Sequence, residues 1–162
     1  MILNRYPFQN NIIIKIVKPT RKYAHEKFVE SKYAIDFLCN LDTPIICVKS
    51  GIVAVVKDDS DKYGFDEKFA NDANFVSVQH KDGTYAEYVH LGKKKVVVKV
   101  GQKVKTGDIL GYAGLSGCMT EPHLHLNFFI IEDEKGISIP AEFKIKKKWN
   151  SRFNYILNAF LQ

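Results

Sequence analysis

Two of the five histidines in this chain, His123 and His125, are separated by one residue within an otherwise apolar run. In a β-strand, successive side chains point to opposite faces, so both imidazoles would share one face of the strand. A buried imidazole without a partner costs free energy, so a bare core strand gains nothing from this pair. The spacing therefore indicates either a metal site or a surface strand with two solvated histidines.

The other histidines are placed by the segments around them. His90 ends the run from Tyr85 to Leu91, and His80 ends the run before it. The Asp82-Gly83 pair between the runs predicts a two-residue hairpin turn, because these residues adopt the backbone angles of a tight turn. That register would set His80 opposite Tyr85, on the face away from His90. We therefore expect His90 to line a cavity and His80 to hydrogen-bond at the turn.

One acid and one upstream histidine complete the set of candidates. Asp36 lies between Ile35 and Phe37, near the start of a predicted strand, where an isolated buried carboxylate would be costly unless a metal or a hydrogen-bond donor relieved it. His25 opens the segment His-Glu-Lys-Phe-Val, in which Val29 occupies the second histidine position of the helical zinc-protease motif. That motif is therefore absent.

The chain is predicted to be all-β. Short runs of β-branched, aromatic and aliphatic residues are separated by glycine-containing turns, which is typical of a sandwich or barrel. The predicted strands cover Ile12–Val17, Ile45–Val48, Ile52–Lys57, Phe75–His80, Tyr85–Leu91, Lys95–Val100, Ile109–Ala113 and His123–Ile131. The polar segment 57–74 is predicted to be a long surface loop. In the tail, apolar residues at helical spacing from Phe153 to Leu161 predict an amphipathic helix over 150–162 that packs on the sheet.

Length and composition indicate a globular protein. A chain of 162 residues, 46% hydrophobic and 26% charged, is expected to form a single domain over 1–162. Its three cysteines, Cys39, Cys47 and Cys118, have no metal-site spacing and imply no disulfide framework.

The net charge of +6 favours polyanionic partners such as an acidic wall polymer. No nucleic-acid motif accompanies the charge, so specific nucleic-acid binding is not expected. No apolar run reaches the roughly 18 residues of a transmembrane segment. The N-terminus lacks the pattern of a secretion signal. We therefore expect a cytoplasmic protein, or a periplasmic or extracellular one if an export signal has been removed.

Several motifs follow one another in an order that resembles a known family. They are YAIDF (33–37), NFVSVQHKDGTYAEYVHL (74–91), VKVGQKVKTGDILGYAGLSG (98–117) and EPHLHLNF (121–128). Together they resemble the lysostaphin/LytM-type zinc endopeptidases of peptidoglycan, over about residues 25–131. The resemblance implies a compact β-sandwich with a groove over one sheet, and a peptidoglycan peptide as substrate.

The resemblance also implies roles for individual residues. One zinc ion per chain would be held by Asp36, His125 and an upstream histidine. His90 and His123 would act on the attacking water or on the transition-state oxyanion. Two histidines and an aspartate are a plausible ligand set for zinc, which at a catalytic site keeps one position open for water.

The sequence departs from the family pattern at the first ligand. Lys32 occupies the usual position four residues before Asp36, and a protonated lysine is a poor zinc ligand. His25 is the only histidine upstream, so the resemblance assigns it as the third ligand. Smaller departures are Asp42 and Glu121 in place of glycines, and Asn127 near a frequent glutamate.

Two alternatives stay open. A catalytically degenerate LytM-like domain could act as a regulatory or wall-binding module, which Lys32 and the altered glycines favour. The segment from Val98 to Gly114 also resembles the hairpin of biotinyl, lipoyl and phosphohistidine carriers. A phosphohistidine carrier could use His90 and His125, but Asp36 would then repel the phosphate.

Overall fold

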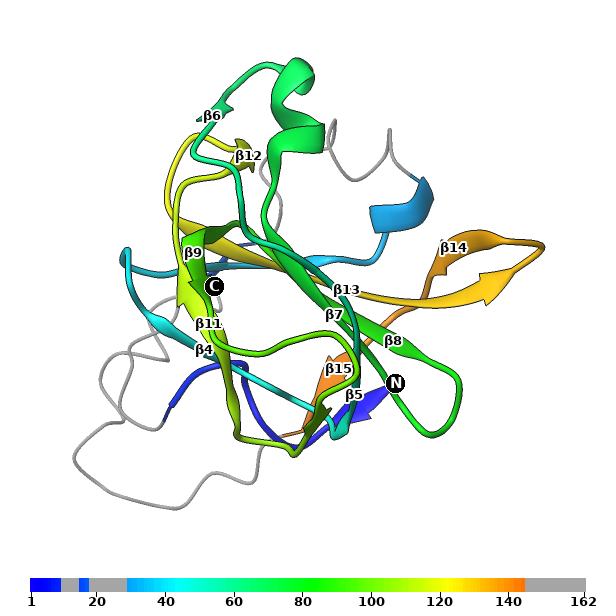
Figure 1. The fold of residues 1–162 in the computed structure, drawn as a ribbon. Helices are drawn as coiled ribbons and strands as arrows, with labels where there is room; N and C mark the ends of the chain where they lie inside the picture. The colour runs from blue at the N-terminus through cyan, green and yellow to red at the C-terminus, as the bar shows by residue number, and fades with distance from the viewer. Residues whose placement is uncertain (10–14, 18–28, 145–162) are drawn as a thin grey trace, which may run out of the picture.

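The structure is a computed structural model that describes residues 1–9, 15–17 and 29–144, and over this range it is dominated by β-strands (Figure 1). The strands are β1 (Ile2–Leu3), β2 (Lys15–Val17), β3 (Ile35–Leu38), β4 (Pro44–Ile46), β5 (Gly51–Lys57), β6 (Tyr63–Gly64), β7 (Phe75–Gln79), β8 (Tyr85–Val89), β9 (Leu91–Val96), β10 (Lys103–Val104), β11 (Ile109–Ala113), β12 (Gly117–Cys118), β13 (His123–Glu132), β14 (Lys135–Ser138) and β15 (Glu142–Phe143). Two short 3-10 helices, η1 (Val29–Ser31) and η2 (Glu67–Asp72), complete the described elements. The predicted C-terminal helix and His25 lie outside the described residues.

The main sheet has eight strands in the order β10-β5-β7-β8-β13-β3-β2, with β14 paired to β13. A second, three-stranded sheet has the order β4-β11-β9. All neighbouring strands in these two sheets are antiparallel. The expected all-β class is therefore confirmed.

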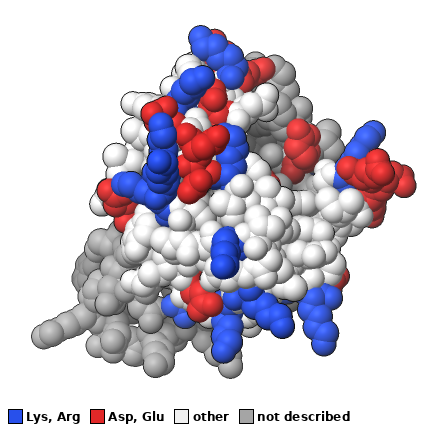
Figure 2. Space-filling model, viewed as in Figure 1, with Lys and Arg blue, Asp and Glu red and all other residues white. Residues whose placement is uncertain are grey.

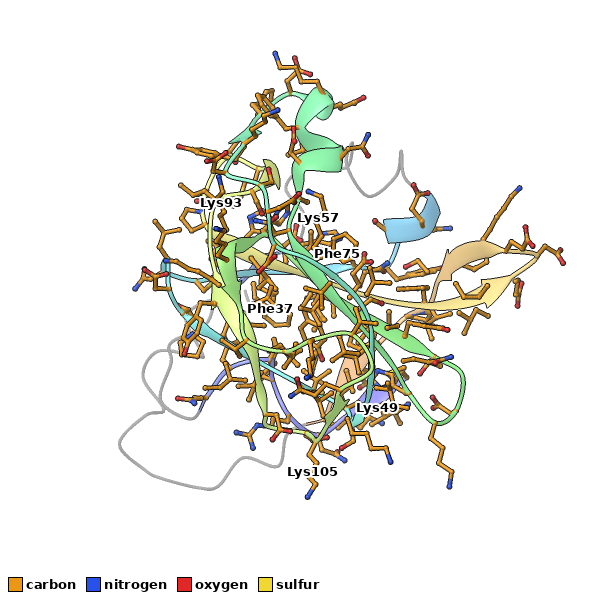
Figure 3. The ribbon with its side chains drawn as sticks, in the orientation of Figure 1. Phe37, Lys49, Lys57, Phe75, Lys93 and Lys105 are labelled. Atoms are coloured by element: carbon orange, nitrogen blue, oxygen red, sulfur yellow. The ribbon has the colours of Figure 1, made fainter. Side chains whose placement is uncertain are left out.

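The hydrophobic core is built from alternate residues of the main-sheet strands. Phe37, Val76, Tyr88 and Leu126 are fully buried or nearly so and belong to one cluster with Leu110 of β11 in the second sheet. Figure 3 shows Phe37 surrounded by carbon side chains in the interior. Because strand side chains alternate, the residues between these core positions lie on the opposite face of the main sheet. That face carries the candidate site.

Predicted and observed strands agree best where turns are sharp, as at β11, whose bounds match the prediction. The predicted strand Lys95–Val100 is wrong in its bounds, because β9 covers Leu91–Val96 and the chain then turns at Gly101, whose φ is 83°. Val100 is 61% exposed there, so its apolar side chain is not part of a core strand. The predicted loop 57–74 contains the short strand β6 and the helix η2.

The hairpin between β7 and β8 also differs from its prediction. Gln79, and not His80, pairs with Tyr85, and the His80 N–H donates to the Thr84 carbonyl at 2.8 Å. Three residues, with Gly83 at a φ of 82°, therefore form the tip. A three-residue tip ending in a left-handed glycine produces the bulge that shifts the register by one residue.

Lysines and acids are interleaved on the face shown in Figure 2. In the lysine-rich segment after Leu91, Lys93 pairs with Asp61 at 2.7 Å and Lys95 pairs with Asp42. These pairs reduce the local positive field that an acidic polymer would need, so polymer binding stays a prediction. No helix in the described part of the chain is long and apolar enough to span a membrane.

Candidate active site

Asp36 and His125 face each other across the paired strands β3 and β13. The register sets His125 opposite Asp36, and His125 Nδ1 lies 2.9 Å from Asp36 Oδ1. His123, two residues earlier on the same face, has its Nε2 4.0 Å from the same carboxylate oxygen. The strand alternation read from His123 and His125 therefore describes their arrangement correctly.

His90 reaches this face through a local change of backbone. In β8, Ala86 and Tyr88 are buried in the core, and continued alternation would turn His90 to the core as well. The φ of His90 is 68°, in the left-handed region, and this ends the alternation. Its ring centroid lies 4.5 Å from that of His123 and 6.0 Å from that of His125.

Backbone carbonyls determine the tautomers of two of these histidines. His90 Nδ1 lies 2.7 Å from the Ser116 carbonyl oxygen, and His123 Nδ1 lies 2.8 Å from that of Glu121. A carbonyl oxygen only accepts, so each Nδ1 carries a proton and donates it. In the neutral rings the Nε2 atoms then carry lone pairs, and either can accept a proton.

Burial determines the charge of His90. Burial, reinforced by the neighbouring His123 and His125, lowers the pKa of His90 to about 3. The imidazole is therefore neutral at neutral pH. A neutral ring with a bare Nε2 can accept a proton, and the lowered pKa means that it releases this proton readily.

Asn127, one of the departures from the family pattern, has a structural role. It is 4% exposed, its Nδ2 donates to the Glu30 carbonyl at 2.7 Å, and its Oδ1 accepts from Ser138 Oγ at 2.9 Å. These bonds join β13 to η1 and β14 at Asn127, which lies two residues after His125 in the chain. On the adjacent strand β8, burial raises the pKa of Glu87, which pairs with Asn127.

Two loops border the site next to His90. The segment from Lys57 to Asn74 and the segment after β11 meet where β6 pairs in parallel with β12. Asn74 and Ser116, both fully buried, belong to these two segments and bond to each other. Sequence analysis missed both residues, because asparagine and serine beside turn glycines are too common to indicate a site.

The pair Asp36 and His125 fits two ligands of a zinc ion. Two donor atoms on a tetrahedral zinc are about 3.3 Å apart, close to the 2.9 Å between Nδ1 and Oδ1 here. Within the described ranges, no group of three or more histidine, cysteine, aspartate or glutamate side chains is arranged to hold a metal.

The remaining candidate residues lie away from this cluster or outside the described residues. Lys32, at the usual position of the first ligand, has its Nζ 5.4 Å above the centre of the Tyr33 ring. His80 lies at the hairpin, where its Nδ1 contacts the Ser50 carbonyl at 3.1 Å, as expected for a hydrogen bonder at a turn. His25 lies outside the described residues, so its position as a ligand stays a prediction.

Comparison with known proteins defines the family. Residues 30–138 match Peptidase family M23, and this chain belongs to that family. It is 32% identical over 161 residues to an uncharacterized metalloprotease of Buchnera aphidicola subsp. Baizongia pistaciae, covering 95% of this chain and 39% of the relative. It is 30% identical over 127 residues to the peptidoglycan DD-endopeptidase ShyA of Vibrio cholerae, covering 78% of this chain and 27% of the relative. The chain thus spans well under half the length of these relatives.

A solved structure supports the same assignment. The catalytic domain of the antimicrobial peptidase lysostaphin from Staphylococcus simulans superposes with a TM-score of 0.51 at 29% identity, covering 65% of this chain and 74% of that domain. The resemblance to lysostaphin/LytM-type endopeptidases that the motifs indicated is therefore confirmed.

Proposed function

We propose that this chain is a zinc-dependent endopeptidase that hydrolyses peptide bonds in the stems or cross-bridges of peptidoglycan. The observation that carries the proposal is that Asp36, His90, His123 and His125, from three segments far apart in sequence, converge on one face of the main sheet. Membership of Peptidase family M23 supports the reaction class, and the similarity to a peptidoglycan DD-endopeptidase supports the substrate.

In this proposal Asp36 and His125 hold the metal, with His25 as the third ligand. A neutral imidazole and a carboxylate suit zinc, and their strands are held in register by the sheet. When bound, zinc supplies a Lewis acid and lowers the pKa of water to about 7.

His90 and His123 would then transfer the protons of the attacking water and the leaving amine. Each ring donates its Nδ1–H to a backbone carbonyl, which leaves Nε2 to take a proton from the attacking water. The protonated ring next to the substrate can afterwards stabilise the oxyanion or protonate the leaving amine. The 4.5 Å between the two ring centroids allows both to contact one reacting centre.

The test combines metal content with release of new amino groups. Purified protein is expected to bind one zinc per chain and to release amines from purified bacterial wall, and His123→Ala is expected to slow this release strongly. Walls with glycine bridges and walls with direct D-amino-acid cross-links should be compared, since either could be the substrate. Stoichiometric zinc without cleavage of either wall type would reject the hydrolase.

The second candidate is a regulatory or wall-binding module of the same fold. It is favoured by Lys32 at the usual ligand position and by the lack of a third metal ligand among the described residues. A regulator should keep its effect on a partner enzyme in the His123→Ala variant. A hydrolase should lose most of its activity when this imidazole is removed.

A further inference from the structure

The orientation of His90 depends on one backbone acceptor. Its Nδ1 donates to the Ser116 carbonyl at 2.7 Å, and among the described residues this is the hydrogen bond that holds the ring. If that carbonyl moved, the ring could rotate or change tautomer, and Nε2 would no longer carry the lone pair that faces the site. The position of the Ser116 carbonyl therefore decides which nitrogen of His90 carries the proton.

The Ser116 side chain ties this carbonyl to the strand that follows His90. Ser116 is fully buried, and its Oγ accepts from the Asn74 N–H at 3.0 Å and donates to the Leu91 carbonyl at 2.9 Å. Leu91 directly follows His90 in the chain. The hydroxyl thus joins the loop that carries the acceptor to the segment that carries the donor.

Asn74, from a third segment, also hydrogen-bonds to the backbone of Leu91. Its Nδ2 donates to the carbonyls of Leu91 at 3.1 Å and Ser60 at 2.7 Å, and its Oδ1 accepts from the Ser60 N–H at 3.0 Å. Its own carbonyl accepts from the Leu91 N–H at 3.1 Å. Every polar group of the Asn74 side chain has a partner, and a fully satisfied buried network keeps its members in one arrangement.

We infer that Asn74 and Ser116 are positioning residues that hold His90 as the Nδ1–H tautomer with its bare Nε2 turned to the site. Neither residue contacts a reacting atom; both act through the Ser116 carbonyl and the Leu91 backbone. The inference rests on the proposed function for the role of His90 in catalysis. The tautomer and its cause do not depend on that role.

The experiment measures the tautomer directly. In zinc-loaded full-length protein, long-range proton–nitrogen NMR spectra with labelled histidine are expected to show His90 with a protonated Nδ1 and an unprotonated Nε2. Ser116→Ala removes the hydroxyl, and Asn74→Asp keeps the shape of the side chain but loses both amide donations. Each variant is expected to convert the single His90 tautomer to a mixture and to lower kcat by about 10-fold or more with little change in KM.

Ser138→Ala is the matched control. Ser138 is also a buried serine whose hydroxyl accepts a backbone N–H, from Tyr33 at 3.0 Å, and donates to a side chain, but it does not bond to the segments around His90. It should lose a comparable amount of stability while keeping the single Nδ1–H tautomer of His90.

Two results would overturn the inference. One is a wild-type His90 with its proton on Nε2, which needs no variant to fold. The other is an unchanged tautomer and kcat in both folded variants. If wild-type protein cleaves no wall but His90 shows the expected tautomer, which Ser116→Ala disturbs, the proposed hydrolase fails and the positioning stands.

Discussion

Single residues in the site have separable tasks. Asp36 and His125 present donor atoms 2.9 Å apart, whereas His123 Nε2 is 4.0 Å from the carboxylate and its Nδ1 is already bonded to a backbone carbonyl. Under the proposed function, Asp36 and His125 would bind the metal ion, and His123 would exchange a proton beside it.

This difference predicts that zinc binding and turnover can be lost separately. Asp36→Ala should lower zinc affinity together with activity, because it removes a ligand. His123→Ala should keep one zinc per chain while kcat falls about 10²- to 10⁴-fold, the usual contribution of a general acid–base group. Zinc titration with a chelating dye and initial rates on a soluble muropeptide measure both. Equal loss of zinc in the two variants would contradict the assignment.

The buried His80 side chain is expected to make the free energy of unfolding depend on pH. It is 3% exposed, its Nε2 has no hydrogen-bond partner among the described residues, and burial lowers its pKa, although its contact with the Ser50 carbonyl and the charge of Asp82 oppose the shift. The folded state therefore binds this proton less readily than the unfolded state. Stability is expected to fall as the pH drops below the unfolded pKa of about 6.5.

The His80→Gln variant checks this. Glutamine can still donate to the Ser50 carbonyl but cannot be protonated. The free energy of unfolding in urea, measured at about pH 7.5 and about pH 5, should differ less in the variant than in the wild type. An unchanged difference would mean that other groups cause the acid sensitivity.

At the scale of elements, the site depends on how closely Gly114, the residue after β11, approaches β9. A Cβ on Gly114 would lie 2.3 Å from Gly92 Cα and 2.5 Å from Gly92 N, both backbone atoms that cannot move aside cheaply. The Gly114 N–H also donates to the His90 carbonyl at 2.9 Å. Glycine at position 114 is thus required by its close contact with the backbone of β9.

Gly114→Ala is therefore expected to destabilise the fold by about 1–3 kcal/mol, as overpacking does, and to lower activity by displacing His90. Gly136→Ala is the control, because its Cβ would meet only the Phe129 ring, at 3.5 Å from Cδ2 and 3.9 Å from Cε2, which are ordinary contacts. That variant should be neutral or about 0.5 kcal/mol more stable, since alanine loses less entropy in a strand. Urea unfolding of both variants measures the difference, and equal effects would show that the close approach is not limiting.

For the whole molecule, the proposed metal would couple the site to global stability. Asp36 and His125 belong to neighbouring strands of the main sheet, and an ion that binds only the folded chain stabilises it by mass action. At 100 times its dissociation constant, zinc would add about 2.7 kcal/mol. A chelator should therefore lower the Tm, and added zinc should restore it.

The Asp36→Ala variant supplies the comparison for this measurement. Its Tm should respond much less to chelator and to zinc, because it lacks one of the two described donors. A wild-type Tm that does not change with zinc would count against a metal at this site.

The local sequence pattern was sufficient to predict much of the fold and part of the candidate site. The bounds of β11 follow from its flanking glycines, and the shared face of His123 and His125 follows from strand alternation alone. The order of motifs also identified the family. These features depend on residue type and on spacing of a few residues, which the sequence states directly.

Tertiary packing decided the rest. The left-handed φ of His90, the one-residue shift at the hairpin and the contact of Asn74 with Ser116 each join segments that are far apart in sequence or override local periodicity. Backbone angles of this kind are stable only because surrounding strands and buried hydrogen bonds hold them. The amino-acid sequence by itself therefore determined which side chains could do the chemistry, and the tertiary structure decided which of their atoms meet.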